Sequence, residues 1–208
     1  MYIFMGGTYD PIHQGHIQGA LHVSQMFVNN AVHLVPAKVP VHKNLPKTTL
    51  EHRIAMLKLA IEAYPELRLD LREVRSENAS YTIDTLKNLR VELGVKRGLL
   101  MVIGMDSFLD LPNWRDAKQF LSLCNLLVLQ RPQYDLTASV LPTFIEGHVA
   151  AHVDELTRCA AGKVCFQQQA PIDISATQIR NQIAVGKSVY ALPRPVLEYI
   201  EKHHLYKS

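Results

Sequence analysis

Cysteine is scarce in this sequence, with only three among 208 residues. An odd number of cysteines, two of them within apolar stretches, does not suit a disulfide framework and indicates reduced thiols in a core. Apolar runs of membrane-spanning length are missing, and the N-terminus begins with a strand pattern in place of a signal-peptide pattern. These absences predict a soluble protein of the cytoplasm that has no membrane partner.

Long runs of one charge are missing as well. The formal net charge is +3, but no cluster of lysine and arginine marks a nucleic-acid surface. The mildly basic balance favours small anionic ligands, and nothing implies an obligate protein partner. No Gly-x-Gly-x-x-Gly follows the first strand pattern, which counts against an NAD-binding oxidoreductase.

Apolar stretches of strand length alternate with helical patterns along the chain. Strand patterns lie at 2–5, 31–35, 67–71, 99–103, 125–130 and 163–167, and helical patterns lie near 15–28, 49–63, 81–93, 114–123, 175–185 and 195–203. This alternation predicts an α/β fold of Rossmann-like type, a doubly wound parallel sheet with helices on both faces. The length suits a single domain, residues 1–208, in which 132–162 is an insertion of uncertain structure.

The most informative segment is 6–16, Gly-Gly-Thr-Tyr-Asp-Pro-Ile-His-Gln-Gly-His, which joins the first strand pattern to the first helical pattern. A helix start presents unpaired N–H groups and the positive end of the helix dipole, which favours phosphate. Gly6 and Gly7 allow a ligand to approach the backbone closely. His13 and His16 are three residues apart, so both should project to one side and donate hydrogen bonds to phosphate. A zinc site is not expected, since no cysteine or third histidine lies nearby.

A second motif, Ile-Ser-Ala-Thr-Gln-Ile-Arg, occupies 174–180 and opens a helix that Gly186 should end. Ser175 and Gln178 have the spacing of a capping box, so helix initiation explains much of the motif. It does not explain Arg180. A cation near a helix N-terminus opposes the dipole, and a bound anion would account for it.

Other candidate residues follow the ends of the predicted strands, where such sheets bind ligands. The loop 36–47 carries Lys38, His42 and Lys43, and a lysine there could reach a polyphosphate, although a solvated charged loop explains it equally well. Gly104 and Asp106 follow the fourth strand pattern. Simple structural explanations also exist for Ser80 as a helix N-cap, Trp114 as packing and Arg131 as a surface charge.

The segment 6–16 resembles the nucleotidylyltransferase signature Gly-Gly-Thr-Phe-Asp-Pro-x-His-x-Gly-His, with Tyr9 in place of phenylalanine. The segment 174–180 is similar to the Ile-Ser-x-Thr-x-Ile-Arg element of the same enzymes. Between them, Ser-Tyr-Thr at 80–82, Gly-Met-Asp-Ser at 104–107, Trp114 and Arg-Pro at 131–132 follow the order found in bacterial nicotinate mononucleotide adenylyltransferases. Residues 40–43 look like the Pro-Pro-His-Lys of that family, with Val41 replacing a proline.

This resemblance implies the transfer of AMP from ATP to nicotinate mononucleotide, with Mg²⁺ accompanying ATP as the cofactor and no metal site in the protein itself. It also implies roles for single residues. The catalytic residues would be His13, His16, Lys43 and Arg180; the ATP-binding residues would be Gly6, Gly7, Thr8, Gly104, Asp106, Arg131, Ser175 and Thr177; and the nicotinate mononucleotide would contact Thr82 and Trp114.

Two other functions are alternatives to this one. Phosphopantetheine adenylyltransferases resemble this chain at 6–16, but they lack the Ser-Tyr-Thr and tryptophan elements. A nucleotide-binding regulatory protein that has lost catalysis would be favoured by the loss of either histidine, and both His13 and His16 are present.

Overall fold

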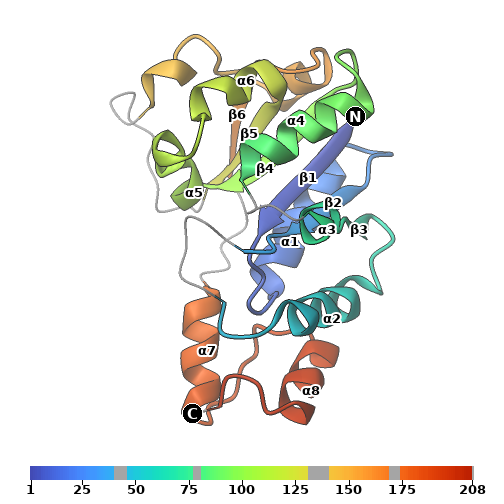
Figure 1. Cartoon of the computed structure of the whole chain (residues 1–208), viewed down its shortest axis with the longest axis vertical. Coiled ribbons are helices and arrows are strands. Elements are labelled where there is room, and N and C mark those ends of the chain that lie inside the picture. The colour runs from blue at the N-terminus through green and yellow to red at the C-terminus, as the bar shows by residue number, and fades with distance from the viewer. Residues whose placement is uncertain (40–45, 77–80, 131–140, 169–173, 208) are drawn as a thin grey trace.

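The computed structural model describes residues 1–39, 46–76, 81–130, 141–168 and 174–207. Within them, six parallel strands form one sheet in the order β3-β2-β1-β4-β5-β6 (Figure 1). The strands are β1 Tyr2–Gly7, β2 Val32–Pro36, β3 Leu67–Leu69, β4 Leu99–Gly104, β5 Asn125–Gln130 and β6 Val164–Gln168. The strand order reverses between β1 and β4, and ligands bind beyond the carboxyl ends of strands at such a point. The predicted fold class is confirmed.

Eight α-helices connect and cover the strands in the described ranges. They are α1 Gln14–Met26, α2 Leu50–Ile61, α3 Arg72–Arg75, α4 Thr82–Leu93, α5 Met105–Leu109, α6 Phe120–Leu123, α7 Ala176–Ala184 and α8 Arg194–Lys202. Figure 1 shows α2, α7 and α8 gathered at one end of the molecule, beyond the carboxyl ends of β1 and β2. His52 and Tyr199 share a hydrogen bond of 2.9 Å that joins α2 to α8. The C-terminal helices therefore return to the edge where a ligand should bind.

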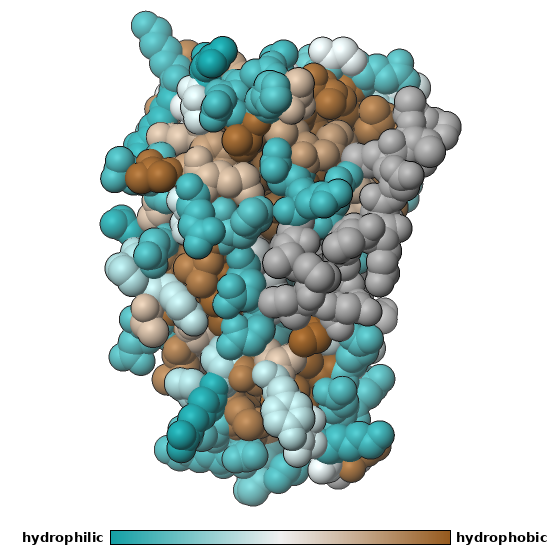
Figure 2. Space-filling view, turned by 180° about the vertical axis from the view of Figure 1, so that it is seen from behind, coloured by the Kyte–Doolittle hydropathy of each residue, from teal (hydrophilic) through white to brown (hydrophobic). Residues whose placement is uncertain are grey.

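Alternate residues of the central strands β1, β4 and β5 enter two separate hydrophobic cores. Ile3 and Val102 are buried with residues of α1, α2 and α8, whereas Phe4 and Met101 are buried with residues of α4, α5 and α6. Strands buried on both faces are mostly apolar at successive positions, which is why the central strands read as nearly continuous apolar runs. Seen from behind, the outer surface is a mosaic in which hydrophilic side chains surround smaller hydrophobic areas (Figure 2).

The prediction of one helix over 114–123 is wrong. Two short 3₁₀ turns, Leu111–Asn113 and Ala117–Gln119, precede the four residues of α6. Trp114 is extended, and Asp116 has a left-handed φ of 54°, which a helix cannot include. The short helices α3 and α5 were not predicted, because elements of one turn show no apolar period.

Within the predicted insertion, the described residues 141–162 contain two 3₁₀ helices, Thr143–Ile145 and Val153–Thr157. The three cysteines are free thiols, and two of them, Cys124 and Cys165, are buried as expected. In the described part of the chain, none of the helices is long and apolar enough to cross a membrane.

Candidate active site

The two histidines of the opening motif lie against each other at the start of α1. His13 is the N-cap residue and only 5% exposed, and the centroids of its ring and of the His16 ring are 3.8 Å apart. A Cβ at Gly15 would lie 3.0 Å from His13 Nδ1, so only glycine leaves room for this imidazole without displacement. The prediction that both rings project to one side is confirmed.

The backbone selects the tautomer of His16. The main-chain N–H of His13 donates to His16 Nδ1 at 3.3 Å, so a neutral His16 carries its proton on Nε2. The ring of Tyr9 meets the His16 ring edge-on, with centroids 5.0 Å apart. Both contacts fix the direction in which His16 Nε2 can donate a hydrogen bond.

The prediction that the N–H groups at the start of α1 are unpaired is wrong for two of them. Gln14 N–H donates to the carbonyl of Ala191 at 2.8 Å, and His16 N–H donates to the carbonyl of His13 at 2.9 Å. The segment that leads into α8 packs against this helix start, and its carbonyl takes the first donor. Fewer main-chain N–H groups are therefore available to an anion at this helix start than the sequence predicts.

Glycines leave an open space at the switch point of the sheet. Among the described residues, no atom lies within 4 Å of the positions that a Cβ at Gly6 or Gly104 would occupy, at the ends of β1 and β4. Gly7 has a different reason to be glycine, because a Cβ there would lie 2.8 Å from the ring of Tyr9. Gly6 and Gly104 can thus admit a ligand, while Gly7 accommodates a buried aromatic ring.

Asp10, in the same turn, joins three distant parts of the chain. It is 3% exposed, and its carboxylate accepts hydrogen bonds of 2.7 Å from Lys47 N–H, Thr48 Oγ1 and the Tyr206 hydroxyl. Burial raises the pKa of Tyr206, so its hydroxyl remains protonated and can donate. The loop before α2 and the C-terminus are therefore anchored to the turn that carries the histidines.

Arg180 reaches the same turn from α7. Its Nη1 donates to the main-chain carbonyl of Asp10 at 2.7 Å, and its Nη2 donates to Thr177 Oγ1 at 3.1 Å. Ser175 forms the predicted capping box, in which Gln178 N–H donates to Ser175 Oγ at 3.2 Å and Ser175 N–H donates to Gln178 Oε1 at 2.8 Å. The structure thus brings together the two motifs from opposite ends of the chain.

Arg53 is a further charged residue at this site. It is 1% exposed and donates hydrogen bonds to main-chain carbonyls of the loops after β1 and β2. Sequence reasoning did not select it. A signal was present, because Arg53 shares the spacing of Met56, Leu57 and Ala60 on the buried face of α2, where a cation is unusual.

Thr82 and Trp114 lie on adjoining segments. The guanidinium of Arg115 stands over the ring of Tyr81, 4.8 Å from its centroid, and so brings the segment after Trp114 against the start of α4, where Thr82 is the first residue. Trp114 Nε1 donates to Asp110 Oδ2 at 3.1 Å, which orients the indole. The contact between Arg115 and Tyr81 joins the two elements that the resemblance assigns to the pyridine nucleotide.

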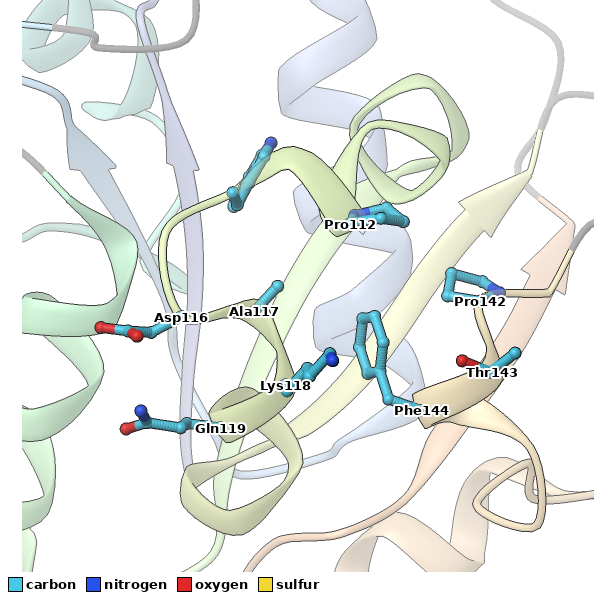
Figure 3. A pocket seen from close by; sticks show the side chains of 9 residues that line it. Pro112, Asp116, Ala117, Lys118, Gln119, Pro142, Thr143 and Phe144 are labelled. Carbon is cyan, nitrogen blue, oxygen red and sulfur yellow. The ribbon is translucent and has the colours of Figure 1, made fainter.

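A pocket of about 490 Å³ lies beside Trp114. In Figure 3, Pro142, Thr143 and Phe144 lie on one side of it, across from Asp116, Ala117 and Gln119. His13, His16 and Arg180 do not line this pocket. It therefore belongs to the tryptophan side of the molecule and is separate from the histidine pair.

Four predicted or candidate site residues, His42, Lys43, Ser80 and Arg131, lie outside the described residues, and the N-cap of α4 is Tyr81 in place of the expected Ser80. Lys38, in the same predicted loop, is described, and its Nζ donates to the carbonyl of Ser76 at 2.6 Å. Asp106 is exposed in the first turn of α5, next to Gly104.

The sequence is similar to those of known proteins over nearly its whole length. The model of the cytidylyltransferase-like family matches residues 4–182. A probable nicotinate-nucleotide adenylyltransferase of Marinomonas sp. (strain MWYL1) is 42% identical over 205 residues, which cover 98% of this chain and 93% of the relative. A second probable nicotinate-nucleotide adenylyltransferase, from Hahella chejuensis (strain KCTC 2396), is 42% identical over 207 residues, which cover 98% of this chain and 94% of the relative.

Solved structures show the same fold. The nicotinic acid mononucleotide adenylyltransferase of Plasmodium falciparum, complexed with NaAD, superposes with a TM-score of 0.75 at 18% identity, covering 99% of this chain and 96% of that one. A putative nicotinate-nucleotide adenylyltransferase of Vibrio parahaemolyticus gives a TM-score of 0.66 at 15% identity, and the match covers 100% of this chain and 97% of that one. The chain belongs to the cytidylyltransferase-like family and, within it, to the nicotinate-nucleotide adenylyltransferases.

Proposed function

We propose that this protein transfers AMP from ATP to nicotinate mononucleotide and releases pyrophosphate, the step that forms nicotinate adenine dinucleotide in NAD biosynthesis. The observation that carries the proposal is the close pair of His13 and His16, whose ring centroids are 3.8 Å apart, held beside Arg180 at the carboxyl end of β1. Relatives of 42% identity with this name, matched over nearly their whole length, support it.

The chemistry requires charge neutralisation more than proton transfer. A phosphate oxygen of nicotinate mononucleotide attacks the α-phosphorus of ATP, and the bond from that phosphorus to the pyrophosphate oxygen breaks. The nucleophile is already anionic at neutral pH, so no general base is needed. Catalysis then depends on in-line placement and on donors directed at the developing charge.

Each donor has a proposed place in this reaction. His16 Nε2, fixed as the protonated nitrogen by the main chain of His13, donates to the α-phosphate together with the His13 ring. Arg180 and Lys43 stabilise the departing pyrophosphate. On the basis of the resemblance, we also assign ATP contacts to Gly6, Gly7, Thr8, Gly104, Asp106, Arg131, Ser175 and Thr177.

ATP enters as its complex with a divalent cation, for which we propose Mg²⁺. Mg²⁺ keeps several water ligands and binds mainly through the phosphates in such sites. Bound to ATP, it neutralises part of the triphosphate charge. We therefore assign the cation to the substrate and not to a metal site of the protein.

We assign the acceptor nucleotide to the side of Thr82 and Trp114. The half-buried indole offers a face on which the pyridine ring can stack, and the hydroxyl of Thr82 can donate to the nicotinate carboxylate. The contact of Arg115 with Tyr81 supports this assignment, because it keeps the two segments together.

Pyrophosphate release with ATP and Mg²⁺ tests the proposal. Nicotinate mononucleotide, nicotinamide mononucleotide and phosphopantetheine are compared as acceptors, and we expect the first to be strongly preferred. Turnover with phosphopantetheine would refute the assignment of Trp114 and Thr82. Release with none of the three would favour a regulatory nucleotide-binding protein.

A further inference from the structure

Arg53 is a buried cation with no carboxylate at ion-pair distance among the described residues, although the buried carboxylate of Asp10 favours its charge from further away. It lies on the inner face of α2, and burial lowers its pKa, although arginine remains charged in proteins. Burying a charge is costly unless hydrogen bonds compensate for it, and an apolar residue of similar size would often be as stable or more stable. Packing alone therefore does not explain an arginine here.

The guanidinium contacts two loops that leave neighbouring strands. Its Nη1 donates to the carbonyls of Thr8 and Ala37, each at 2.8 Å, and its Nη2 donates to the carbonyl of Lys38 at 3.0 Å. Thr8 lies in the turn after β1, and the other two residues begin the segment after β2. The main chain adds one bond between the same loops, from Ala37 N–H to the carbonyl of Gly7 at 2.9 Å.

The planar shape of the guanidinium suits this arrangement. A lysine could offer its charge, but it could not hold carbonyls of two loops in a fixed fork. The Nε atom of Arg53 is also buried and has no hydrogen-bond partner among the described residues. A buried donor without a partner is a cost to stability.

We propose that Arg53 is a positioning residue of the adenylyl transfer. It sets the distance between the turn of Thr8 and the loop that begins at Ala37, and its charge lies behind the turn that receives the ATP phosphates. This inference rests on the proposed function only in placing ATP at that turn. Arg53 itself touches neither substrate.

Two substitutions separate geometry from charge. In Arg53→Met both the fork and the charge are removed, and we expect kcat to fall about a hundredfold and the Kd for ATP to rise about tenfold. In Arg53→Lys the charge remains, so we expect ATP affinity within threefold of the wild type while kcat falls about tenfold. These values correspond to the cost of misplacing reacting groups and of losing charge-assisted contacts.

Arg90 provides a matched control. It also donates to main-chain carbonyls, those of Leu123 at 2.5 Å and Ala160 at 2.7 Å, but it lies on α4 away from the phosphate turn. The Arg90→Met variant should lower the melting temperature without changing kcat or ATP affinity by more than about twofold. For each variant of the full chain, kcat would be measured by pyrophosphate release and the Kd of ATP with Mg²⁺ by calorimetry.

The outcomes are distinct. If Arg53→Met retains kcat and ATP affinity as Arg90→Met does, the role of Arg53 is structural and the inference is overturned. If Arg53→Met does not fold, Arg53→Lys decides, and an unchanged kcat overturns the inference. If the wild type releases no pyrophosphate with any acceptor, the proposed function fails, while the ATP affinities of the variants still test Arg53.

Discussion

Replacing Asp10 by asparagine tests how the site is held together. Asparagine keeps the shape of the side chain and one oxygen, which can still accept hydrogen bonds from Thr48 and Tyr206. The new NH₂ group, however, meets the N–H of Lys47 at the position where the carboxylate now accepts at 2.7 Å. Two donors then face each other, and the N–H of Lys47 loses its charged acceptor.

The magnitude follows from these contacts. Losing a charge-assisted hydrogen bond and leaving a part-buried N–H unsatisfied should lower the free energy of unfolding by about 3 kcal/mol. For a chain of this length, that corresponds to a drop in melting temperature of roughly 6–12 °C. Because Arg180 is bound to the carbonyl of Asp10 and His13 follows in the same turn, kcat should also fall, by about tenfold.

Thermal unfolding followed by circular dichroism, with pyrophosphate release on the same samples, gives both values for Asp10→Asn. Tyr206→Phe is the matched control, because it removes one donor and leaves Asp10 bound to Thr48 and Lys47. It should cost about 1 kcal/mol. The reasoning would be refuted if Asp10→Asn were no less stable than Tyr206→Phe, or if its kcat were that of the wild type.

Three further changes probe the histidines. His16→Ala should lower the melting temperature by only a few degrees, because the His13 N–H loses its acceptor, and should lower kcat about a hundredfold, as the loss of one preorganised donor does; near-normal turnover would remove His16 from the mechanism. Gly15→Ala places a Cβ 3.0 Å from His13 Nδ1, so kcat should fall more than ATP affinity, and an unchanged kcat would show that the ring can shift freely. Burial lowers the pKa of His33, so the unfolded state takes up a proton first and stability should fall as the pH drops through about 6.5. Urea unfolding at pH 7.5 and 5.5 gives the free energy of unfolding of the wild type and of His33→Gln. The decrease between the two pH values should be smaller for His33→Gln, and an equal decrease in both proteins would exclude this explanation.

The sequence alone was sufficient where the information is local. Apolar runs of strand length alternate with helical patterns because both faces of the sheet are buried, and this predicted the fold class. The spacing of His13 and His16 placed both rings on one side of a helix start, and the spacing of Ser175 and Gln178 predicted the capping box. Each of these features depends on residues at most a few positions apart.

The tertiary structure decided what depends on distant partners. Asp10 and Tyr206 are 196 positions apart, and nothing near either residue indicates their hydrogen bond. Arg53 binds main-chain carbonyls, which every residue possesses and which therefore leave no mark in the sequence. The first N–H of α1 is occupied by Ala191 for the same reason. Local patterns thus set the strands, the helices and the identity of the reactive groups, whereas long-range contacts between side chains and backbone set their geometry.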